Sequence, residues 1–188
     1  MNKVKKTALA VSVTGILAIA GFEGFVGDAY QPLPGDKWTI GFGHTEGVTP
    51  GDKMSPGEAL SILRKDTASA QRAVNKLVQV PMSQNEFDAL VSLVYNIGET
   101  QFRSSTLLKC VNAGDYECVS RQWMRWKYFK GEPIKGLENR RAKELYIYSG
   151  GEVRKSADGS ICFGPHGCVS SYDFLQERTS GPDKAKEY

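Results

Sequence analysis

An uncharged, largely apolar segment near the N-terminus constrains this 188-residue chain more than any other feature. Residues 7–22 carry no charge and follow three lysines, Lys3, Lys5 and Lys6. Lysines before an apolar run are the layout of an export signal. The run is shorter than the roughly 20 residues of a robust transmembrane helix, and Ala, Gly, Ser and Thr dilute its larger apolar residues. Two alternatives are open: a signal peptide cleaved after Ala20, or an uncleaved anchor that binds the membrane reversibly.

The distribution of charge argues against a nucleic-acid-binding protein. Residues 1–150 carry 19 basic and 15 acidic side chains, and three of the basic ones belong to the N-terminal lysine cluster. Residues 151–188 carry 5 basic and 6 acidic side chains. No part of the sequence has the basic patch that binding to phosphates requires. The lysines therefore indicate membrane targeting.

Apolar alternation predicts a short hairpin after the N-terminal segment. Trp38, Ile40 and Phe42 are separated by Thr and Gly residues. A period of two with interspersed glycines is typical of short, twisted strands. We therefore expect a hairpin within residues 36–49.

Two capping boxes mark the starts of the longer helices. Ser55 pairs with Glu58, with Pro56 at the first helical position, and Ser83 pairs with Glu86. Apolar residues follow each box at helical spacing. The sequence therefore predicts helices at about 55–79, 83–98, 104–112, 116–128 and 136–148.

The cysteines predict disulfide bonds. There are four of them, an even number, and an export signal would place them in an oxidising compartment. Their spacing does not suit a zinc site. Three connectivities are possible, and we favour the local pairs Cys110–Cys118 and Cys162–Cys168. The second pair lies in a Gly-, Ser- and Pro-rich tail that follows Gly150.

Three groups of residues resemble the phage-type lysozymes, or endolysins. Glu23 is followed by Tyr30 and by the run Trp-Thr-Ile-Gly-Phe-Gly-His at residues 38–44. Residues 95–100 are similar to the family's helix end with an aromatic residue, Asn and Gly, and residues 136–144 are similar to its Arg-rich C-terminal helix. The resemblance implies an α+β, lysozyme-like fold of two lobes. A small hairpin lobe and a larger helical lobe would follow the N-terminal signal-anchor helix and enclose a glycan cleft.

The resemblance also implies a catalytic set. Glu23 would donate the proton, since a carboxyl group at the edge of an apolar element suits a general acid. Thr39 would position the attacking water, and a nearby Asp would assist it. The family's usual spacing places this Asp at residue 32, which is Pro32 here. We therefore assign the role to Asp36, with Asp28 and a mechanism without this carboxylate as alternatives.

Three further residues would support the site by the same resemblance. His44 would be structural and would pair with Asp66. Arg141 would contact Glu23 and hold it in place, with Arg140 as the less favoured candidate.

The implied activity is hydrolysis of peptidoglycan at the β-1,4 bond between N-acetylmuramic acid and N-acetylglucosamine, causing lysis of the bacterial host. No metal or cofactor is implied, and the protein is expected to be a monomer. Its expected partners are glycan strands and, through the N-terminal helix, the inner membrane. A lytic transglycosylase, which cuts the same bond without water, and a non-enzymatic wall-binding protein are the alternatives.

The position of the proposed acid favours the uncleaved anchor. Cleavage after Ala20 would leave Glu23 as the third residue of a free N-terminus, whereas the resemblance requires an ordered helix leading into it. The protein would first lie in the host inner membrane facing the periplasm and later become soluble in the periplasm. The expected division of the chain is a signal anchor, a catalytic domain and a disulfide-containing extension, at residues 1–22, 23–149 and 150–188.

Overall fold

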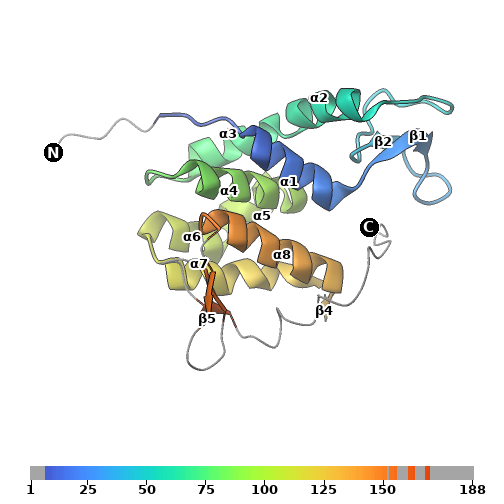
Figure 1. Cartoon of the computed structure of the whole chain (residues 1–188). Helices are drawn as coiled ribbons and strands as arrows, with labels where there is room; N and C mark the ends of the chain where they lie inside the picture. The colour runs from blue at the N-terminus through green and yellow to red at the C-terminus, as the bar shows by residue number, and fades with distance from the viewer. Residues whose placement is uncertain (1–6, 152, 156–160, 164–167, 170–188) are drawn as a thin grey trace.

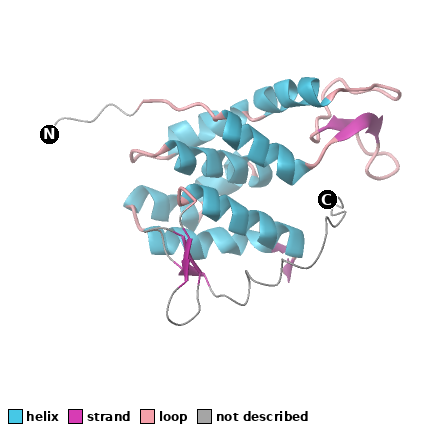
Figure 2. Cartoon of the chain, in the orientation of Figure 1, coloured by secondary structure: helices cyan, strands magenta, loops and turns pink. Residues whose placement is uncertain are grey.

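The computed structural model describes residues 7–151, 153–155, 161–163 and 168–169. Figure 1 shows the helices gathered in one body, with β1 (Val26–Tyr30) and β2 (Thr39–Gly41) at one end of it. Helices dominate the described part, and the strands are short (Figure 2). This is the α+β arrangement of a small sheet-bearing lobe and a larger helical lobe that the sequence predicts.

Helix α1 (Val13–Glu23) forms from the apolar N-terminal segment. The Ser12 hydroxyl caps it by accepting from the N–H of Gly15 at 3.0 Å. The helix packs on α2 (Pro56–Asp66) and α4 (Gln84–Ile97), and Ile16 and Ile19 are buried. No helix among the residues that the structure describes is long and apolar enough to cross a membrane.

Strands β1 and β2 pair antiparallel and are joined by a long loop. Val26 lies opposite Gly41, and Tyr30 lies opposite Thr39. The prediction of a hairpin within residues 36–49 is confirmed only in part: Ile40 and His44 form an antiparallel bridge inside that range, with two backbone hydrogen bonds of 2.9 Å, but the paired strand of the sheet lies outside it. Strand β2 falls inside that range, but its partner lies upstream, because strand pairing across a loop leaves no local periodicity to detect.

Gly41 shows why this lobe is rich in glycine. Its φ is 66°, and a Cβ atom there would lie 2.9 Å from Sδ of Met54 and 3.2 Å from Cβ of Ala59. Any larger residue would meet both backbone strain and a steric clash. The sheet can therefore lie directly on the start of α2.

The helix predicted at about 55–79 is two helices, α2 and α3 (Ala68–Leu77). The capping box of Ser55 and Glu58 starts α2 as predicted. The break lies at Thr67, whose hydroxyl donates to the carbonyl of Arg64 at 3.0 Å and accepts from the side chain of Gln71 at 3.1 Å. A hydroxyl that bonds the local backbone competes with the regular helix, and periodicity alone does not reveal this.

Helix α4 is the centre of the core and confirms the prediction of a helix at about 83–98. Ser83 and Glu86 form the second capping box, and Gly98 ends the helix with φ 87°. The helix packs against α1, α3, α5 (Glu99–Ser104) and α8 (Lys135–Tyr148). Its middle is buried on all sides, including Phe87, Leu90, Val91 and Val94.

The next two predicted helices are shorter than expected. The range 104–112 corresponds to α6 (Thr106–Ala113), and the range 116–128 is divided among α7 (Tyr116–Trp123), the 3-10 turn η1 (Met124–Lys127) and β3 (Tyr128–Phe129). A disulfide joins Cys110 of α6 to Cys118 of α7 and confirms the first predicted pair.

The C-terminal part contains the last long helix and a small sheet. Strand β3 pairs with β4 (Glu132–Pro133), and α8 follows at the predicted place. Beyond it, β5 (Val153–Lys155), β6 (Ile161–Phe163) and β7 (Cys168–Val169) form an antiparallel sheet in which Cys162 is opposite Cys168. The side chains of this pair lie outside the described part, so their disulfide stays a prediction.

Candidate active site

Glu23 is the last residue of α1, and its side chain is 23% exposed. Gly24 ends the helix with φ 67°, a conformation that favours glycine, and its N–H donates to the carbonyl of Ala20 at 3.0 Å. The chain then passes directly into β1 (Figure 1). Glu23 therefore lies at the junction between the helical body and the sheet.

The partner of Glu23 is Arg140 of α8. Its Nη1 donates to Oε1 of Glu23 at 2.8 Å, and its guanidinium carbon lies 5.2 Å from the centre of the Phe22 ring. The expectation that Arg141 makes this contact is wrong. Consecutive helical residues point about 100° apart, and only the packing of α8 determines which of two neighbouring arginines faces α1.

Arg141 points instead into the core, where it is fully buried. Its Nη2 donates to Oδ1 of Asn96 at 2.9 Å, and its Nε lies 3.0 Å from Oε2 of Glu144. Burial lowers the pKa of Arg141 to about 10, Glu144 opposes that shift, and the neighbouring charge of Arg140 adds to it. The guanidinium still carries its proton at neutral pH.

Glu144 lies behind Arg140 and completes a buried polar cluster that the sequence analysis missed. One of its oxygens accepts from the Ser92 hydroxyl at 2.7 Å and from Nε of Arg140 at 3.1 Å, and the other accepts from Nε1 of Trp123 at 3.1 Å. The spacing of Arg140 and Glu144 by four residues is the one sequence signal that pairs them. The contacts from α4 and α7 leave no such signal.

Tyr95 lies close enough to Glu23 and Asp66 to be influenced by both carboxylates. Burial raises its pKa to about 12, with Glu23 and Asp66 adding to the rise and Arg140 opposing it. The phenol is therefore neutral near pH 7.

The expected pairing of His44 with Asp66 is confirmed. Nδ1 of His44 lies 2.8 Å from Oδ2 of Asp66, and both side chains are mostly buried. The pair borders a cavity of about 410 Å³ that also includes Tyr95. The other residues lining this cavity come from the loop after β2 and from α2 and α3: Gly43, Thr45, Glu46, Lys65, Ala68, Ser69 and Arg72.

The other expected catalytic residues lie in or beside the sheet. Thr39 is buried at the start of β2, and its hydroxyl donates to the carbonyl of Lys37 at 3.1 Å. Asp36 lies in the exposed loop, where its carboxylate accepts from the N–H of Leu33 at 3.1 Å. Within residues 7–151, neither Thr39 nor Asp36 is hydrogen-bonded to Glu23.

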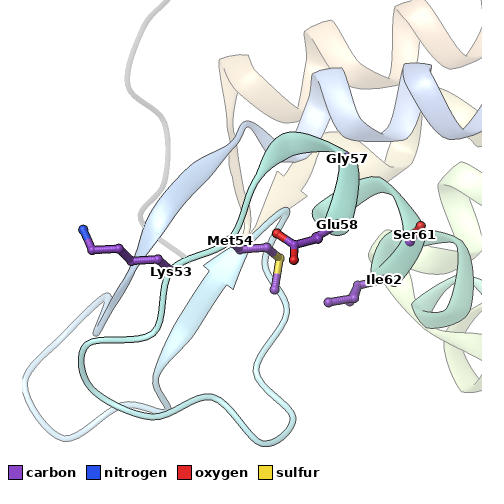
Figure 3. Close-up of a pocket in the computed structure, with 6 residues that line it drawn as sticks. All are labelled: Lys53, Met54, Gly57, Glu58, Ser61 and Ile62. Carbon is purple, nitrogen blue, oxygen red and sulfur yellow. The ribbon is translucent and has the colours of Figure 1, made fainter.

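Asp28, the alternative to Asp36, is occupied elsewhere. Its carboxylate accepts from Nζ of Lys53 at 2.6 Å in an exposed ion pair. Lys53 also borders a second cavity of about 430 Å³, between the loop before α2 and the first turns of that helix (Figure 3). The Glu58 carboxylate that borders this cavity is used by the capping box with Ser55.

Comparison with known protein families gives a match over most of the chain. The profile of the phage lysozyme family matches residues 20–144. These residues include Glu23, Arg140 and Glu144, so the whole polar cluster lies within the matched region.

Individual relatives and solved structures agree with the family match. The chain is 39% identical over 142 residues to an endolysin of Acyrthosiphon pisum secondary endosymbiont phage 1, covering 73% of this chain and 97% of that protein. It is 35% identical over 143 residues to a SAR-endolysin of Enterobacteria phage P21, covering 74% and 87%. The structure of an endolysin from Escherichia coli O157:H7 phage FAHEc1 superposes with a TM-score of 0.69 at 37% identity, covering 76% and 95%.

Proposed function

Since the chain belongs to the phage lysozyme family and is a peptidoglycan-cleaving lysozyme, we propose that it hydrolyses the β-1,4 bond between N-acetylmuramic acid and N-acetylglucosamine, with Glu23 as the general acid. The observation that carries this role is the position of Glu23 at the junction of the two lobes, where Arg140 holds one of its oxygens. A carboxyl group held there by one fixed donor keeps its second oxygen available to a substrate.

The reaction requires a proton for the leaving sugar and a water for the anomeric carbon. Glu23 gives its proton to the glycosidic oxygen as that bond breaks, and positive charge develops on the ring that remains. Water then adds its hydroxide to the anomeric carbon, its remaining proton passes to the solvent, and Glu23 takes up a proton from the solvent to complete the cycle. We assign the orientation of this water to Thr39, with Asp36 assisting from the loop that precedes β2.

The test is lysis of purified peptidoglycan by Glu23→Gln, which keeps the shape of the side chain and removes the transferable proton. We expect turbidity clearing to fall by about 10²-fold to 10⁴-fold while the folded structure is retained. The matched control is Asp28→Asn, which changes an exposed carboxylate of the same lobe and should clear peptidoglycan like the wild type.

The products decide between cleavage mechanisms. Hydrolysis leaves a reducing N-acetylmuramic acid end, whereas a lytic transglycosylase leaves a 1,6-anhydro end that is lighter by one water. Anhydro products in mass spectra would exclude the proposed hydrolysis. Near-normal lysis by Glu23→Gln would exclude Glu23 as the acid.

We further propose that residues 7–22 are an uncleaved signal anchor that leaves the host inner membrane and then joins the catalytic domain in the periplasm. The relatives include proteins named SAR-endolysins. In support, α1 carries apolar residues on its exposed as well as its buried side: Val13 is 65% exposed and Leu17 is 53% exposed, while Ile16 and Ile19 are buried. A helix that is apolar on every side suits both lipid and a protein core.

The stretch before α1 supports the same proposal. Side chains of α3 and α4 bind backbone groups of residues 9–12, which precede α1. Asn75 accepts from the N–H of Leu9 at 3.1 Å and donates to its carbonyl at 2.8 Å. The side chain of Gln71 accepts from the N–H of Val11, and that of Gln84 donates to the carbonyl of Ala10. The carboxylate of Asp88 accepts from both the N–H and the hydroxyl of Ser12.

The release is tested by fractionating cells before and after an uncoupler, together with N-terminal sequencing. Full-length protein should move from the membrane to the soluble fraction as lysis begins. A mature N-terminus at Gly21 would contradict the proposal. Thr14→Leu makes the exposed side of α1 more apolar and should retain the protein in the membrane, whereas a larger side chain at Gly15 would clash with Asp88 at 2.7 Å and would confound the result.

A further inference from the structure

We infer that Glu144 is a positioning residue, which fixes the guanidinium of Arg140 so that Nη1 points at Glu23. The inference rests on the proposed role of Glu23 as the acid. Glu144 lies too deep in the core to contact a glycan, since its side chain is 0% exposed. Its influence on the reaction must pass through Arg140.

Each nitrogen of Arg140 has its own partner. Nε donates to Glu144 at 3.1 Å, Nη2 donates to the carbonyl of Ser92 at 3.3 Å, and Nη1 donates to Glu23 at 2.8 Å. The guanidinium is planar, so two fixed nitrogens set the direction of the third. The Phe22 ring covers the group at 5.2 Å and limits its tilt.

Glu144 is itself fixed by donors from three helices. Ser92 on α4 and Trp123 on α7 bind its oxygens at 2.7 Å and 3.1 Å, and Nη2 of Arg141 on α8 donates at 3.3 Å. A buried carboxylate with this many donors has one favourable orientation. The packing of α4, α7 and α8 therefore fixes Glu144, and Glu144 in turn fixes the position of Arg140.

Charge adds a second reason for an acidic residue at this position. Arg140 and Arg141 are adjacent, buried cations, and Glu144 contacts both. If Glu144 were neutral, the two guanidinium groups would face each other with no anion between them, and repulsion would displace Arg140, which is the one with access to the surface. Contact between Arg140 and Glu23 would then be lost or lengthened.

The competing explanation is that Glu144 only stabilises the fold. A double-mutant cycle separates the two. If Glu144 acts through Arg140, then Glu144→Gln lowers kcat about 10-fold to 100-fold in the wild type but has little further effect in an Arg140→Gln background. A purely structural residue would lower kcat by the same factor in both backgrounds.

The experiment measures kcat and KM on a soluble oligosaccharide of alternating N-acetylglucosamine and N-acetylmuramic acid, with thermal unfolding recorded for each variant. We expect kcat to fall while KM stays within about twofold, because ground-state binding of the glycan is untouched. Glu138→Gln is the matched control: it removes a carboxylate from the same helix that contacts Lys127 at 2.5 Å and Lys135 at 3.2 Å, and it should keep the wild-type kcat.

Two outcomes would overturn the inference. One is equal effects of Glu144→Gln in the two backgrounds. The other is a wild-type kcat for Glu144→Asp, which retains the charge and withdraws it from Arg140 by one methylene, and which serves where Glu144→Gln does not fold. An inactive Glu23→Gln in the same assay keeps the proposed function intact in either case, whereas an active one refutes that function separately.

Discussion

The two halves of the candidate site are built in different ways. Glu23 and Phe22 come from α1, a helix with two large residues exposed and an N-terminal approach held by side-chain hydrogen bonds. Arg140 and its supports come from α4, α7 and α8, where the polar groups are buried and bonded to one another. Glu23 thus lies on a helix that packs on α2 and α4 but leaves part of its apolar surface exposed, whereas Arg140 lies on α8, whose contacts with α4 include a buried polar cluster.

The attachment of α1 should depend on its few buried residues, and this gives the largest expected effect. Ile19 is 0% exposed, so Ile19→Ala should lower the free energy of unfolding by about 2–5 kcal/mol. Leu17→Ala, two residues away on the exposed side, should change it by less than about 0.5 kcal/mol. Chemical denaturation measures both, and equal effects would mean that α1 is not docked as the structure shows.

Helix α7, which contributes to the Arg140 half of the site, is joined to α6 by a disulfide. Loss of this bond should have the next largest effect on the free energy of unfolding. The disulfide joins Cys110 of α6 to Cys118 of α7, eight positions apart in the sequence. Replacing both cysteines by serine should lower the free energy of unfolding by about 2–3 kcal/mol. The thermal midpoint with and without reductant measures this. A wild-type midpoint for the double variant would show that packing alone holds this pair of helices.

The polar contacts before α1 should contribute less than either. Asn75→Ala removes two hydrogen bonds to Leu9 and should lower the free energy of unfolding by about 1–2 kcal/mol. Lys76→Ala alters the exposed neighbour and serves as the control. Hydrogen exchange at residues 9–12 should accelerate in the first variant alone, and unchanged exchange would contradict the role assigned to Asn75.

The smallest effect near neutral pH is expected for Tyr95, which lies close enough to Glu23 and Asp66 to be influenced by both carboxylates. Tyr95 has its pKa raised from 10.0 to about 12, mainly by burial, so the unfolded chain loses this proton at lower pH than the folded protein does. The resulting stability is fully present below pH 10 and is lost as pH rises toward 12. Tyr95→Phe should therefore lose less stability than the wild type between these values. Parallel curves for the two proteins would refute the assignment.

Local patterns were sufficient where the determinants are local. Helix α4 follows from a capping box and apolar spacing, and the bond between Cys110 and Cys118 follows from their short separation. The pairing of His44 with Asp66 came from family resemblance, because no local rule joins residues 22 positions apart.

The predictions that were wrong concern features that depend on tertiary contacts. The upstream partner of β2 and the break at Thr67 are set by pairing and by one hydroxyl group rather than by periodicity. Arg140 and Arg141 are the same residue type, so the sequence does not distinguish them. Only the packing of α8 against α1 and α4 directs Arg140 to Glu23 and Arg141 into the core. The roles of Asp36 and Thr39 remain proposals, since neither is bonded to Glu23 in the part of the chain described.

None of the groups that fix Glu144, and through it the Nε of Arg140, belongs to α1: Ser92, Trp123 and Arg141 lie on α4, α7 and α8. If α1 binds to a helical body that has already folded, as we propose, the loss of rotamer entropy for the Arg140 side chain, roughly 2 kcal/mol, has already occurred when α4, α7 and α8 fix it. Docking of α1 then orders Glu23 and buries Ile16 and Ile19. In this proposal Glu23 meets a donor whose direction is already fixed, so forming their contact requires no further ordering of Arg140.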